Sequence, residues 1–399
     1  MDRSELDALL TPEGLRLVDS LGDLESSDEV AGAVSRLRAA GHSPDLVSAV
    51  VGQARLRARA RAKFGPFADR MLFTRAGLEQ ATRLEIAARH AGRFRDAGAT
   101  RIADLGCGIG GDALGMAGLG LEVVAVDADE VTAALAAYNL APFGEAAEVR
   151  HARAEDVDLS GADAVWLDPA RRTGGHSETR RVSADEWSPS LDWVFELAGR
   201  MPAGVKLGPA FDRTQIPTGA EAQWISVDGS TIELVAWTGK FARDGVTRAA
   251  LVVRGGQAAE LTASGDAEDV ELRDLGAFVH EPEGAVIRAR LIGEVARSLE
   301  AGMAGEGIAY LTSDAALTSP FVQSFRVRDV MPLKVPTINA ALAANGIGAL
   351  EIKKRGVDID PAQFRRKLRL RGDTSATLIL TKLGPRATGR RVAILADRV

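Results

Sequence analysis

The pattern of hydrophobic and polar positions divides the chain into three regions. Residues 1–98 carry apolar positions at helical spacing, such as Leu6, Leu9 and Leu10, which predicts a helical region. Residues 100–255 alternate short apolar runs with longer amphipathic runs, the pattern of a parallel sheet whose strands alternate with helices. A second unit with both strand and helix patterns follows from about residue 271 to the end.

The middle region contains eight apolar runs of strand length. The last few follow one another through short turns, which predicts an antiparallel edge after five parallel strands. Residues 256–270 are polar and rich in Ala, Gly, Asp and Glu, so we expect an exposed turn or domain link there. The expected strands are 101–105, 122–127, 147–151, 164–168, 204–208, 223–227, 231–238 and 248–254.

Two further predictions concern the flanking regions. Glu79-Gln80-Ala81-Thr82 is expected to open an amphipathic helix that runs to about Phe94. In the last region the order of elements suggests a small α+β sandwich, which we expect to be ferredoxin-like. Its expected strands are 276–282, 308–312, 321–330, 349–353 and 376–381, and its expected helices are 284–301, 335–345 and 361–370. The predicted domains are therefore 1–98, 99–258 and 271–399.

Composition and charge narrow the class of protein. The 399 residues are 46% hydrophobic and 26% charged, as in ordinary globular proteins. No run has the length of a membrane-spanning helix and no signal-peptide pattern opens the chain, so we expect a cytoplasmic protein. A single cysteine excludes an internal disulfide and a cysteine-rich zinc site, and we expect no metal centre. The net charge of −6 gives no global sign of nucleic-acid binding.

The run from Ile102 to Asp112 is the most informative part of the sequence. It has the pattern of a strand end, a glycine-rich turn and the start of a helix. Glycines permit positive φ and close approach to a ligand, and the helix directs its N-terminus to the same place. A second apolar strand ends in the carboxylate of Asp127. Together these features predict a nucleoside-binding crevice at the carboxyl ends of parallel strands.

Two carboxylates decide between the possible nucleosides. Gly106, Gly108 and Gly111 satisfy the dinucleotide pattern G-x-G-x-x-G, which is weak when taken alone. Asp104 lies two residues before the first glycine, and Asp112 follows the turn directly. Both would repel a pyrophosphate but would suit a cationic, amine-bearing ligand. We therefore favour S-adenosylmethionine (SAM) over NAD.

At this point the sequence resembles the class I SAM-dependent methyltransferases. Asp104 to Gly111 is similar to their first motif, Ala154-Glu155-Asp156 to the third and Val165 to Arg172 to the fourth. The resemblance implies a Rossmann-like α/β core, an Asp127 that holds the ribose hydroxyls, and an acidic side chain near Asp156 that faces the adenine amino group. The implied cofactor-binding residues are Asp104, Gly106, Gly108, Gly110, Asp112, Asp127, Ala128, Glu155, Asp156 and Asp168.

A narrower resemblance covers about residues 60–399. The Asp-Pro-Ala-Arg-Arg run and His280-Glu281-Pro282 resemble a bacterial group that carries a THUMP-like domain after the methyltransferase core. True THUMP domains bind RNA, so the resemblance implies RNA by analogy. The core is also distantly similar to RNA-cap guanine-N2 methyltransferases.

The candidate catalytic residues are Asp168, Pro169 and Arg171. Asp168 could accept a hydrogen bond from an exocyclic amine and direct it at the methyl group. Amino-methylating enzymes usually carry Asp or Asn, Pro, Pro and an aromatic residue here, whereas this chain has Ala170 and Arg171 in the last two places. Arg171 could stack on a base, clamp a phosphate or form a structural ion pair. The roles of Arg172 and His176 stay open. Lys206 could face the substrate, but a structural pairing is favoured, and a nucleophilic Cys107 is disfavoured.

Two segments are locally basic. Residues 54–101 hold twelve Lys or Arg against four Asp or Glu, and residues 351–372 hold eight against three. The regions 55–101 and 353–371 could guide RNA, or they could be solvated helix faces. We predict a methyltransferase for a base in structured RNA (tRNA or rRNA). The alternatives are a small-molecule or protein acceptor, or a non-catalytic RNA-binding protein with a degenerate core.

Overall fold

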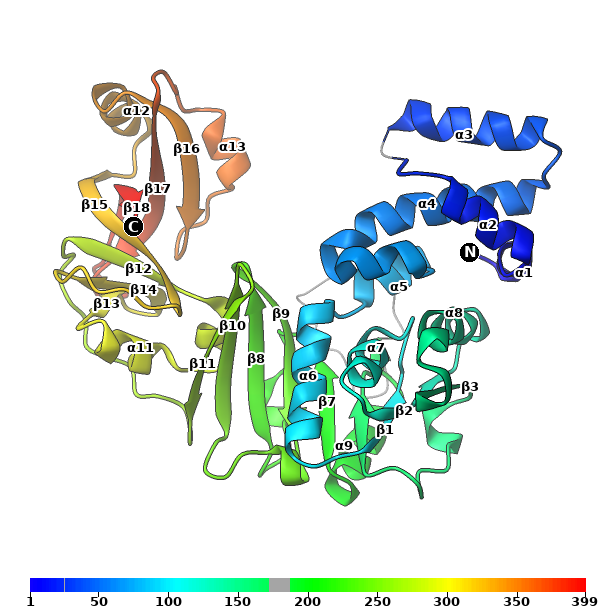
Figure 1. The fold of residues 1–399 in the computed structure, drawn as a ribbon. Helices are drawn as coiled ribbons and strands as arrows, with labels where there is room; N and C mark the ends of the chain where they lie inside the picture. The colour runs from blue at the N-terminus through cyan, green and yellow to red at the C-terminus, as the bar shows by residue number, and fades with distance from the viewer. Residues whose placement is uncertain (25, 172–186) are drawn as a thin grey trace. The chain divides into compact units, whose positions relative to one another are not determined.

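The computed structural model describes residues 1–24, 26–171 and 187–399, with the side chain of Arg171 excepted. The chain forms two compact units. The first contains Met1–Leu207, Pro217–Ala220 and Ala236–Ala242, and the second contains Gly208–Ile216, Glu221–Val235 and Arg243–Val399. Figure 1 shows the elements of both along the chain.

Residues 1–98 form helices, as predicted. Ser26 and Glu29 form a reciprocal capping box, and Ser43 caps the next helix just before Pro44, which satisfies backbone N–H groups at both helix starts. Leucine and valine side chains from several of these helices pack into one core cluster. The helices are α1 Arg3–Leu9, α2 Pro12–Ser20, α3 Ser27–Ala39, α4 Pro44–Phe64, α5 Arg75–Gln80 and α6 Leu84–Asp96.

The helix expected from Glu79 to Phe94 was wrong at its start. Glu79 and Gln80 end α5, and α6 begins only at Leu84. The Lys63 ammonium donates to the carbonyl oxygens of Leu78, Glu79 and Ala81 at 2.7–2.8 Å, which satisfies the end of α5. This helix end allows the chain to turn between α5 and α6.

Five parallel strands form the core sheet, in the order β7-β4-β1-β2-β3. The apolar runs of β1, β2, β4 and β7 are buried because helices cover the sheet, whereas the edge strand β3 is partly exposed. Figure 1 shows α6 beside α7 in front of this sheet. The elements are β1 Arg101–Leu105, α7 Gly111–Gly118, β2 Glu122–Asp127, α8 Glu130–Leu140, β3 Ala147–His151, β4 Ala164–Leu167, α9 Leu191–Arg200 and β7 Ala203–Leu207.

Four more strands extend this sheet beyond β7, in the order β9-β8-β10-β11. They are β8 Glu221–Val227, β9 Ser230–Trp237, β10 Arg248–Arg254 and β11 Gln257–Ala263. Strand β11 pairs antiparallel with β10, which gives the antiparallel edge that was predicted. The expectation of a turn or link over 256–270 was wrong in its first half, because an edge strand with one solvent-facing side tolerates polar residues.

The second sheet has seven strands, in the order β13-β14-β12-β15-β18-β17-β16. Strand β12 Phe278–Pro282 is followed by two helices, α10 Gly284–Arg288 and α11 Ile292–Ser298, instead of the single helix expected over 284–301. Arg290 between them has φ of 62°, which ends the helix. The other elements are β13 Gly302–Gly305, β14 Ile308–Ser313, β15 Val322–Pro332, α12 Val335–Ala344, β16 Ile347–Lys354, α13 Pro361–Arg365, β17 Thr374–Leu383 and β18 Arg390–Arg398.

The α+β character of this region is confirmed, but its sheet is larger than the four strands of a ferredoxin-like fold. The prediction omitted β13 and β18. Gly302-Met303-Ala304-Gly305 lacks β-branched residues, so its pattern does not suggest a strand. Strand β18 pairs with both β15 and β17 and therefore joins two parts of the sheet.

Candidate active site

The glycine turn connects β1 to α7 and adopts a conformation that only glycine accepts easily. Gly106, Gly108 and Gly110 have φ of 93°, 56° and 86°. A Cβ on Gly106 would lie 2.8 Å from the backbone oxygen of Asp168, so a larger residue would push the end of β4 away. The N–H groups of Gly106 and Cys107 donate to the Val126 carbonyl oxygen at 2.9 Å. The turn is thus fixed against two neighbouring strands.

Asp127 ends β2 and connects to this turn. Its carboxylate accepts from the backbone N–H groups of Gly108 at 3.0 Å and Asp129 at 2.9 Å. Burial raises the pKa of Asp127 above its usual value, although both hydrogen bonds favour the ionised form. Asp127 therefore both shapes the turn and presents a carboxylate beside it.

Asp104 lies on β1 with only 1% of its surface exposed. Neither carboxylate oxygen has a hydrogen-bond partner among the residues that the structure describes. Burial, together with the charges of Asp112 and Asp168, raises the pKa of Asp104 well above its usual value. A buried carboxylate without a donor is costly, so this position is suited to a cationic ligand that supplies one.

Asp112, at the start of α7, has partners on both oxygens. The Thr82 hydroxyl donates to Oδ2 at 2.7 Å, and Nδ1 of His90 lies 2.9 Å from Oδ1. The Lys206 ammonium lies 3.7 Å from Oδ2. Although burial opposes ionisation, the His90 hydrogen bond and the Lys206 charge lower the pKa of Asp112 to about 2. Asp112 is therefore ionised and directed toward protein partners.

Asp168 and Pro169 follow the end of β4. The Asp168 backbone N–H donates to the Leu105 carbonyl oxygen at 3.2 Å, and its side chain accepts from the Lys206 ammonium at 2.5 Å. Pro169 is buried. Arg171 belongs to the short strand β5 Ala170–Arg171, whose partner is β6 Trp187–Ser188. The Arg171 side chain, Arg172 and His176 lie outside the described residues.

The remaining residues predicted for the cofactor lie at the ends of β2 and β3. Ala128 is exposed, and its carbonyl oxygen lies 3.2 Å from Nε2 of His151. Glu155 and Asp156 are exposed in the turn Ala154–Asp156, where Glu155 pairs with Arg153 at 3.0 Å. These carboxylates follow the last strand of the parallel series and are open to solvent.

A segment from the helical region borders the glycine turn. A Cβ on Gly77 of α5 would lie 2.5 Å from Ile109, so α5 packs directly on the turn. Asn139 of α8 exchanges hydrogen bonds with the backbone of Leu72, at 2.7 and 3.0 Å, and donates to the Ile109 carbonyl oxygen at 2.9 Å. This single side chain ties residue 72 to the turn.

Aromatic rings pack around His90, which is hydrogen-bonded to Asp112. His90 lies 4.5 Å from Trp166 and 6.1 Å from Trp237, measured between ring centroids. Phe94 contacts both tryptophans edge to face. A Cβ on Gly204 would approach both indoles to within 2.7 Å, so β7 needs glycine there. Tight aromatic packing holds His90, and with it Asp112, in one place.

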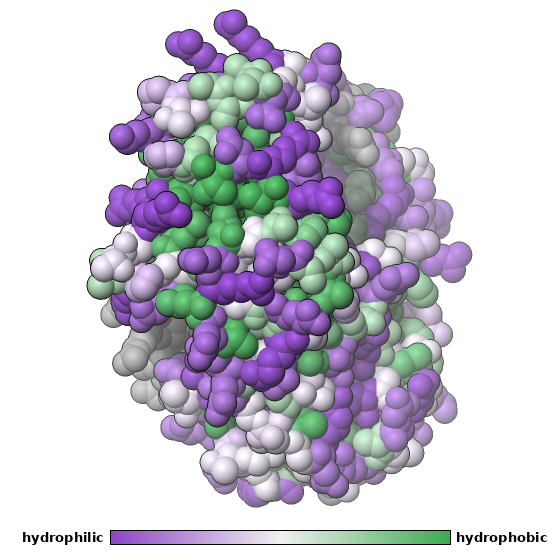
Figure 2. All heavy atoms as spheres, turned by 90° about the vertical axis from the view of Figure 1, so that its left-hand side faces the viewer, coloured by the Kyte–Doolittle hydropathy of each residue, from purple (hydrophilic) through white to green (hydrophobic). Residues whose placement is uncertain are grey.

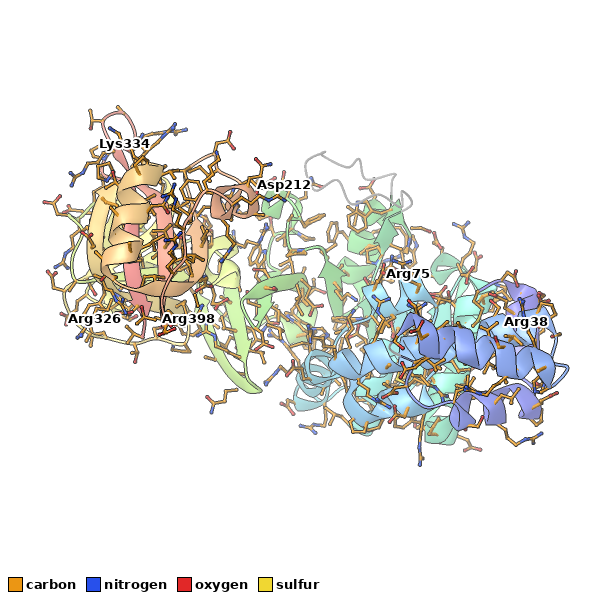
Figure 3. The ribbon with its side chains drawn as sticks, turned by 90° about the horizontal axis from the view of Figure 1, so that it is seen from above. Arg38, Arg75, Asp212, Arg326, Lys334 and Arg398 are labelled. Atoms are coloured by element: carbon orange, nitrogen blue, oxygen red, sulfur yellow. The ribbon has the colours of Figure 1, made fainter. Side chains whose placement is uncertain are left out.

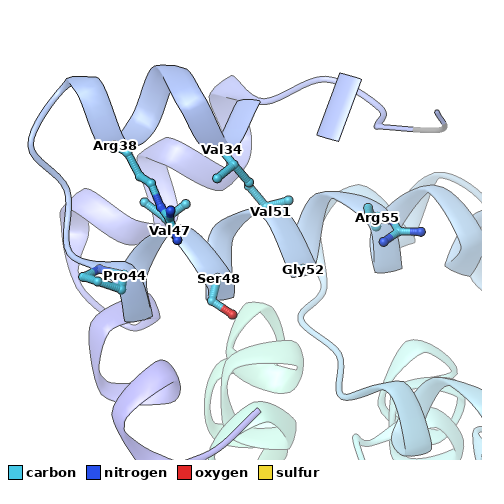
Figure 4. Close-up of a pocket in the computed structure, with 8 residues that line it drawn as sticks. All are labelled: Val34, Arg38, Pro44, Val47, Ser48, Val51, Gly52 and Arg55. Carbon is cyan, nitrogen blue, oxygen red and sulfur yellow. The ribbon is translucent and has the colours of Figure 1, made fainter. Parts of the chain in front are cut away.

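Two surface hollows occur elsewhere in the first unit. Figure 4 shows one between α3 and α4, lined by apolar side chains with Arg38 and Arg55 at its rim. The other is lined by residues such as Arg101, Arg150 and Asp158. Neither hollow includes the glycine turn. Within the described ranges, three or more His, Cys, Asp or Glu side chains nowhere gather in a way that could hold a metal ion.

Some cations of the first basic region, 55–101, form contacts within the protein. Arg57 is buried and bonds to the Met71 carbonyl and to Asp19, and Arg61 pairs with Asp23 and Asp69. Arg55 and Arg59 are exposed. Lys63 caps α5, so three of the five cations from Arg55 to Lys63 make structural contacts.

The second basic region, 353–371, contains both paired and solvent-exposed cations. Lys353 and Arg355 pair with Glu281 at 2.6 and 3.5 Å. The helix expected over 361–370 was too long, because α13 ends at Arg365. Arg365 is exposed and donates to the Leu350 carbonyl oxygen. Five other exposed cations form neither an ion pair nor a side-chain hydrogen bond with the described residues. These residues are Lys354, Arg366, Lys367, Arg369 and Arg371.

Residues 366–371 form a well-supported loop, which we call the basic loop. Asn339 of α12 donates to the Lys367 carbonyl at 3.2 Å and accepts from the Arg369 N–H at 2.8 Å. Leu368 and Leu370 pack on the core of the second sheet, while the alternating Arg369 and Arg371 face solvent. Figure 3 shows other cations of this domain, with Lys334 on one side and Arg326 and Arg398 on another.

The chain is similar to known proteins over most of its length. It is 31% identical over 358 residues to a Mycobacterium tuberculosis protein described as an uncharacterised S-adenosylmethionine-dependent methyltransferase. The match covers 88% of this chain and 95% of the relative. The chain belongs to the SAM-dependent methyltransferases. This membership confirms the predicted cofactor class and the predicted enzyme class.

Other comparisons agree with the fold of this methyltransferase. A solved structure from Porphyromonas gingivalis W83, assigned provisionally to the methyltransferases, matches with a TM-score of 0.70 at 18% identity. The match covers 94% of this chain and 100% of that chain. A family profile described as THUMP domain-like matches residues 322–398, and one for a domain of unknown function matches residues 2–60. The predicted C-terminal THUMP-like domain is thus confirmed.

Several residues of the methyltransferase site were not found from the sequence. His90, Thr82 and Asn139 lie on helices or helix ends, and the prediction gave none of them a role. Asn139 offered one usable signal, since it is a polar residue next to Leu140 in an otherwise apolar helix face. His90 offered less, because a histidine in an amphipathic helix has no fixed meaning.

Proposed function

We propose that this methyltransferase transfers the methyl group of SAM to an exocyclic amine of a base in structured RNA, tRNA or rRNA. The observation that carries the proposal is the position of Asp168. It follows β4, its backbone meets Gly106 of the cofactor turn, and its side chain is one-third exposed. A carboxylate at this point can hold an N–H group next to the cofactor turn.

The residues around the turn fit SAM. Asp104 offers two buried oxygens without a donor, which suits a cationic amine. The backbone of Gly106, Gly108 and Gly110 leaves room for close approach. Asp127 ends β2 and Ala128 follows it, where the ribose and adenine would lie. Glu155 and Asp156 follow β3 and would face the adenine amino group. Asp112 would support the site through Thr82 and Lys206.

The chemistry asks little of the protein beyond alignment. SAM, when bound, supplies a methyl group already activated on a sulfonium. Asp168 would accept a hydrogen bond from the acceptor N–H, orient its lone pair, and hold the proton that leaves the nitrogen after attack. Pro169, buried beside it, limits the backbone freedom of this segment. The Arg171 side chain would stack on the base or clamp a phosphate.

The second unit supports RNA as the substrate. The basic loop and Lys354 present five exposed cations within the region around the THUMP-like match. Few aromatic side chains accompany them, so backbone and shape recognition of a structured RNA suits this surface better than base stacking. On the face in Figure 2, hydrophilic side chains surround a smaller hydrophobic patch. With RNA as substrate, the protein would act in the cytoplasm.

No helix among the described residues is long and apolar enough to cross a membrane.

The decisive experiment is methylation of total RNA from cells that lack this gene. Purified protein with isotopically labelled SAM should transfer label to one nucleoside, identified by mass spectrometry after digestion. That nucleoside should be absent from the RNA of the deletion strain and present in the parent. Asp168→Ala should abolish transfer while SAM binding persists. If the wild-type protein binds SAM but labels no RNA from the deletion strain, the RNA proposal is wrong and a small-molecule or protein acceptor takes its place.

A further inference from the structure

Lys206 lies near the end of β7 and points into the site. Its side chain is 13% exposed, so most of the ammonium group has lost its water. It donates to Asp168 Oδ2 at 2.5 Å and to the Thr82 hydroxyl at 3.0 Å, and it lies 3.7 Å from Asp112 Oδ2. One lysine thus connects the end of β4, the start of α7 and the chain just before α6.

The hydrogen-bond directions in this network are fixed. Lysine only donates, so the Thr82 hydroxyl accepts from Lys206 and gives its proton to Asp112. Ionised Asp112 only accepts, so His90 Nδ1 donates to it. His90 packs against Trp166 and Trp237, with ring centroids 4.5 and 6.1 Å away. The position of the Lys206 ammonium is therefore determined by packing that begins in α6.

We infer that Lys206 is a positioning residue for methyl transfer, which binds one side of the Asp168 carboxylate and fixes its orientation and charge for the acceptor amine. The inference rests on the proposed function in one respect, namely that Asp168 is the group that meets the acceptor. Lys206 itself would not contact the acceptor. It would act on methyl transfer through its contact with the Asp168 carboxylate.

The charge balance of the site argues against a purely structural ion pair. The carboxylates of Asp168 and Asp112 lie 2.5 and 3.7 Å from the Lys206 ammonium, the buried Asp104 is close enough to interact with its charge, and His90 is bonded to the other oxygen of Asp112. A buried lysine adds little net stability, because the loss of its hydration offsets the attraction. Asp168, by contrast, is exposed enough to meet a substrate on its other side. The lysine is thus placed where orientation matters more than stability.

The first test measures the Asp168 carboxylate directly and needs no RNA. Protein labelled with 13C at the aspartate carboxyl carbon is titrated by NMR, and the Asp168 signal is identified by its loss in Asp168→Asn. In Lys206→Met the Asp168 signal should titrate about one pH unit or more higher than in the wild type, because the nearest positive charge is gone. Lys206→Arg should restore most of the wild-type behaviour. An unchanged titration in Lys206→Met would overturn the inference.

The second test separates positioning from binding by kinetics. With the RNA identified above, Lys206→Met should lower kcat about 100-fold, as misplacement of a reacting group by about 1 Å does, while KM for RNA and Kd for SAM stay within about threefold. Thr82→Val removes one acceptor of Lys206 but keeps its charge, so kcat should fall about fivefold to tenfold. If Lys206→Met does not fold, the kcat of Thr82→Val is the measurement that tests the inference. Lys240→Met, at an exposed lysine, is the matched control and should behave as the wild type.

The outcomes of the two proposals are distinguishable. If the wild type methylates no RNA but the Asp168 titration depends on Lys206, the acceptor is wrong and the role of Lys206 stands. If RNA is methylated and Lys206→Met leaves kcat unchanged, even with a shifted titration, the proposed function stands and Lys206 is structural.

Discussion

Asp104 and His280 are both buried polar side chains on the first strand of their sheets. They differ in their hydrogen-bond partners. His280 on β12 has Nδ1 at 2.8 Å from the Ser324 hydroxyl and Nε2 at 2.9 Å from the Ser313 hydroxyl. Asp104 on β1 has no such partner among the described residues. The exposed fraction is 0% for His280 and 1% for Asp104, so the two residues do not differ in burial.

The difference predicts a structural role for His280 and a binding role for Asp104. A buried group with all its hydrogen bonds made gives the fold a unique arrangement, and nothing is left over for a ligand. A buried carboxylate without donors lowers stability, and a protein retains it where a ligand completes it. His280-Glu281-Pro282 served as a recognition motif in the sequence, yet His280 is a core residue of the second sheet.

The largest expected effect is the loss of SAM binding in Asp104→Asn. Removal of the carboxylate leaves the cationic part of SAM without its counter-charge, which costs about 3–4 kcal/mol or several hundredfold in Kd. Isothermal calorimetry with SAM measures this. Glu122→Gln, at an exposed position on the neighbouring strand, is the matched control and should bind as the wild type does.

The same variant should be more stable than the wild type without SAM. The raised pKa of Asp104 means that folding disfavours its ionised form. The loss in the free energy of unfolding that Asp104 causes is absent at low pH and grows as pH rises above the ordinary aspartate pKa. It reaches its full size above the pKa of Asp104 in the folded protein. Denaturation curves should therefore show a gain for Asp104→Asn that increases with pH. Equal SAM affinity together with equal stability would show that Asp104 is an ordinary core residue.

The next effect concerns His280 and the pH dependence of stability. Burial lowers the pKa of His280 from 6.5 to about 4. Between these values the unfolded chain binds a proton that the folded protein does not, so the free energy of unfolding falls by up to about 3 kcal/mol as pH drops from 6.5 to 4. In His280→Gln this part of the slope should vanish, as measured by urea unfolding at several pH values.

SAM binding provides the contrast for His280. At neutral pH His280→Gln should bind SAM with wild-type affinity, because the residue belongs to the second unit. A loss of SAM affinity without a loss of stability would contradict the structural role of His280.

The smallest effect is expected for single cations of the basic loop. Arg369→Gln and Arg371→Gln should each weaken RNA binding about threefold to tenfold and reduce the salt dependence of the affinity by about one counterion. Filter binding across a salt series measures both. Arg328→Gln removes an arginine that is paired with Asp397 and is the control. If all three variants lose affinity equally, the loop makes no particular contribution.

The strands of the parallel sheet were predictable because their signal is local. Four of them, 101–105, 122–127, 147–151 and 248–254, have the bounds that the apolar runs indicated. β11 escaped prediction because an edge strand keeps polar residues on its open side. The end of α5 depends on the Lys63 cap, which comes from a residue distant in sequence.

The site was predictable only where residues follow one another along the chain. The glycine turn and Asp127 have a fixed spacing, so a motif finds them. His90, Thr82 and Asn139 come from three other segments, and only the folded chain brings them to the turn. The roles of the individual site residues and the boundaries 1–98, 99–258 and 271–399 stay predictions.

The hydrogen bonds of Asn139 bear on how a chain of this architecture could arise by recombination. Leu72 and Ile109 are both held by that one amide, and Asp112 depends on Thr82 and His90. A recombination event that joined a foreign helical segment to strand β1 would leave the amide and the carboxylate buried without partners. The helices before residue 98 and the sheet after it would therefore be inherited together, as one unit of descent.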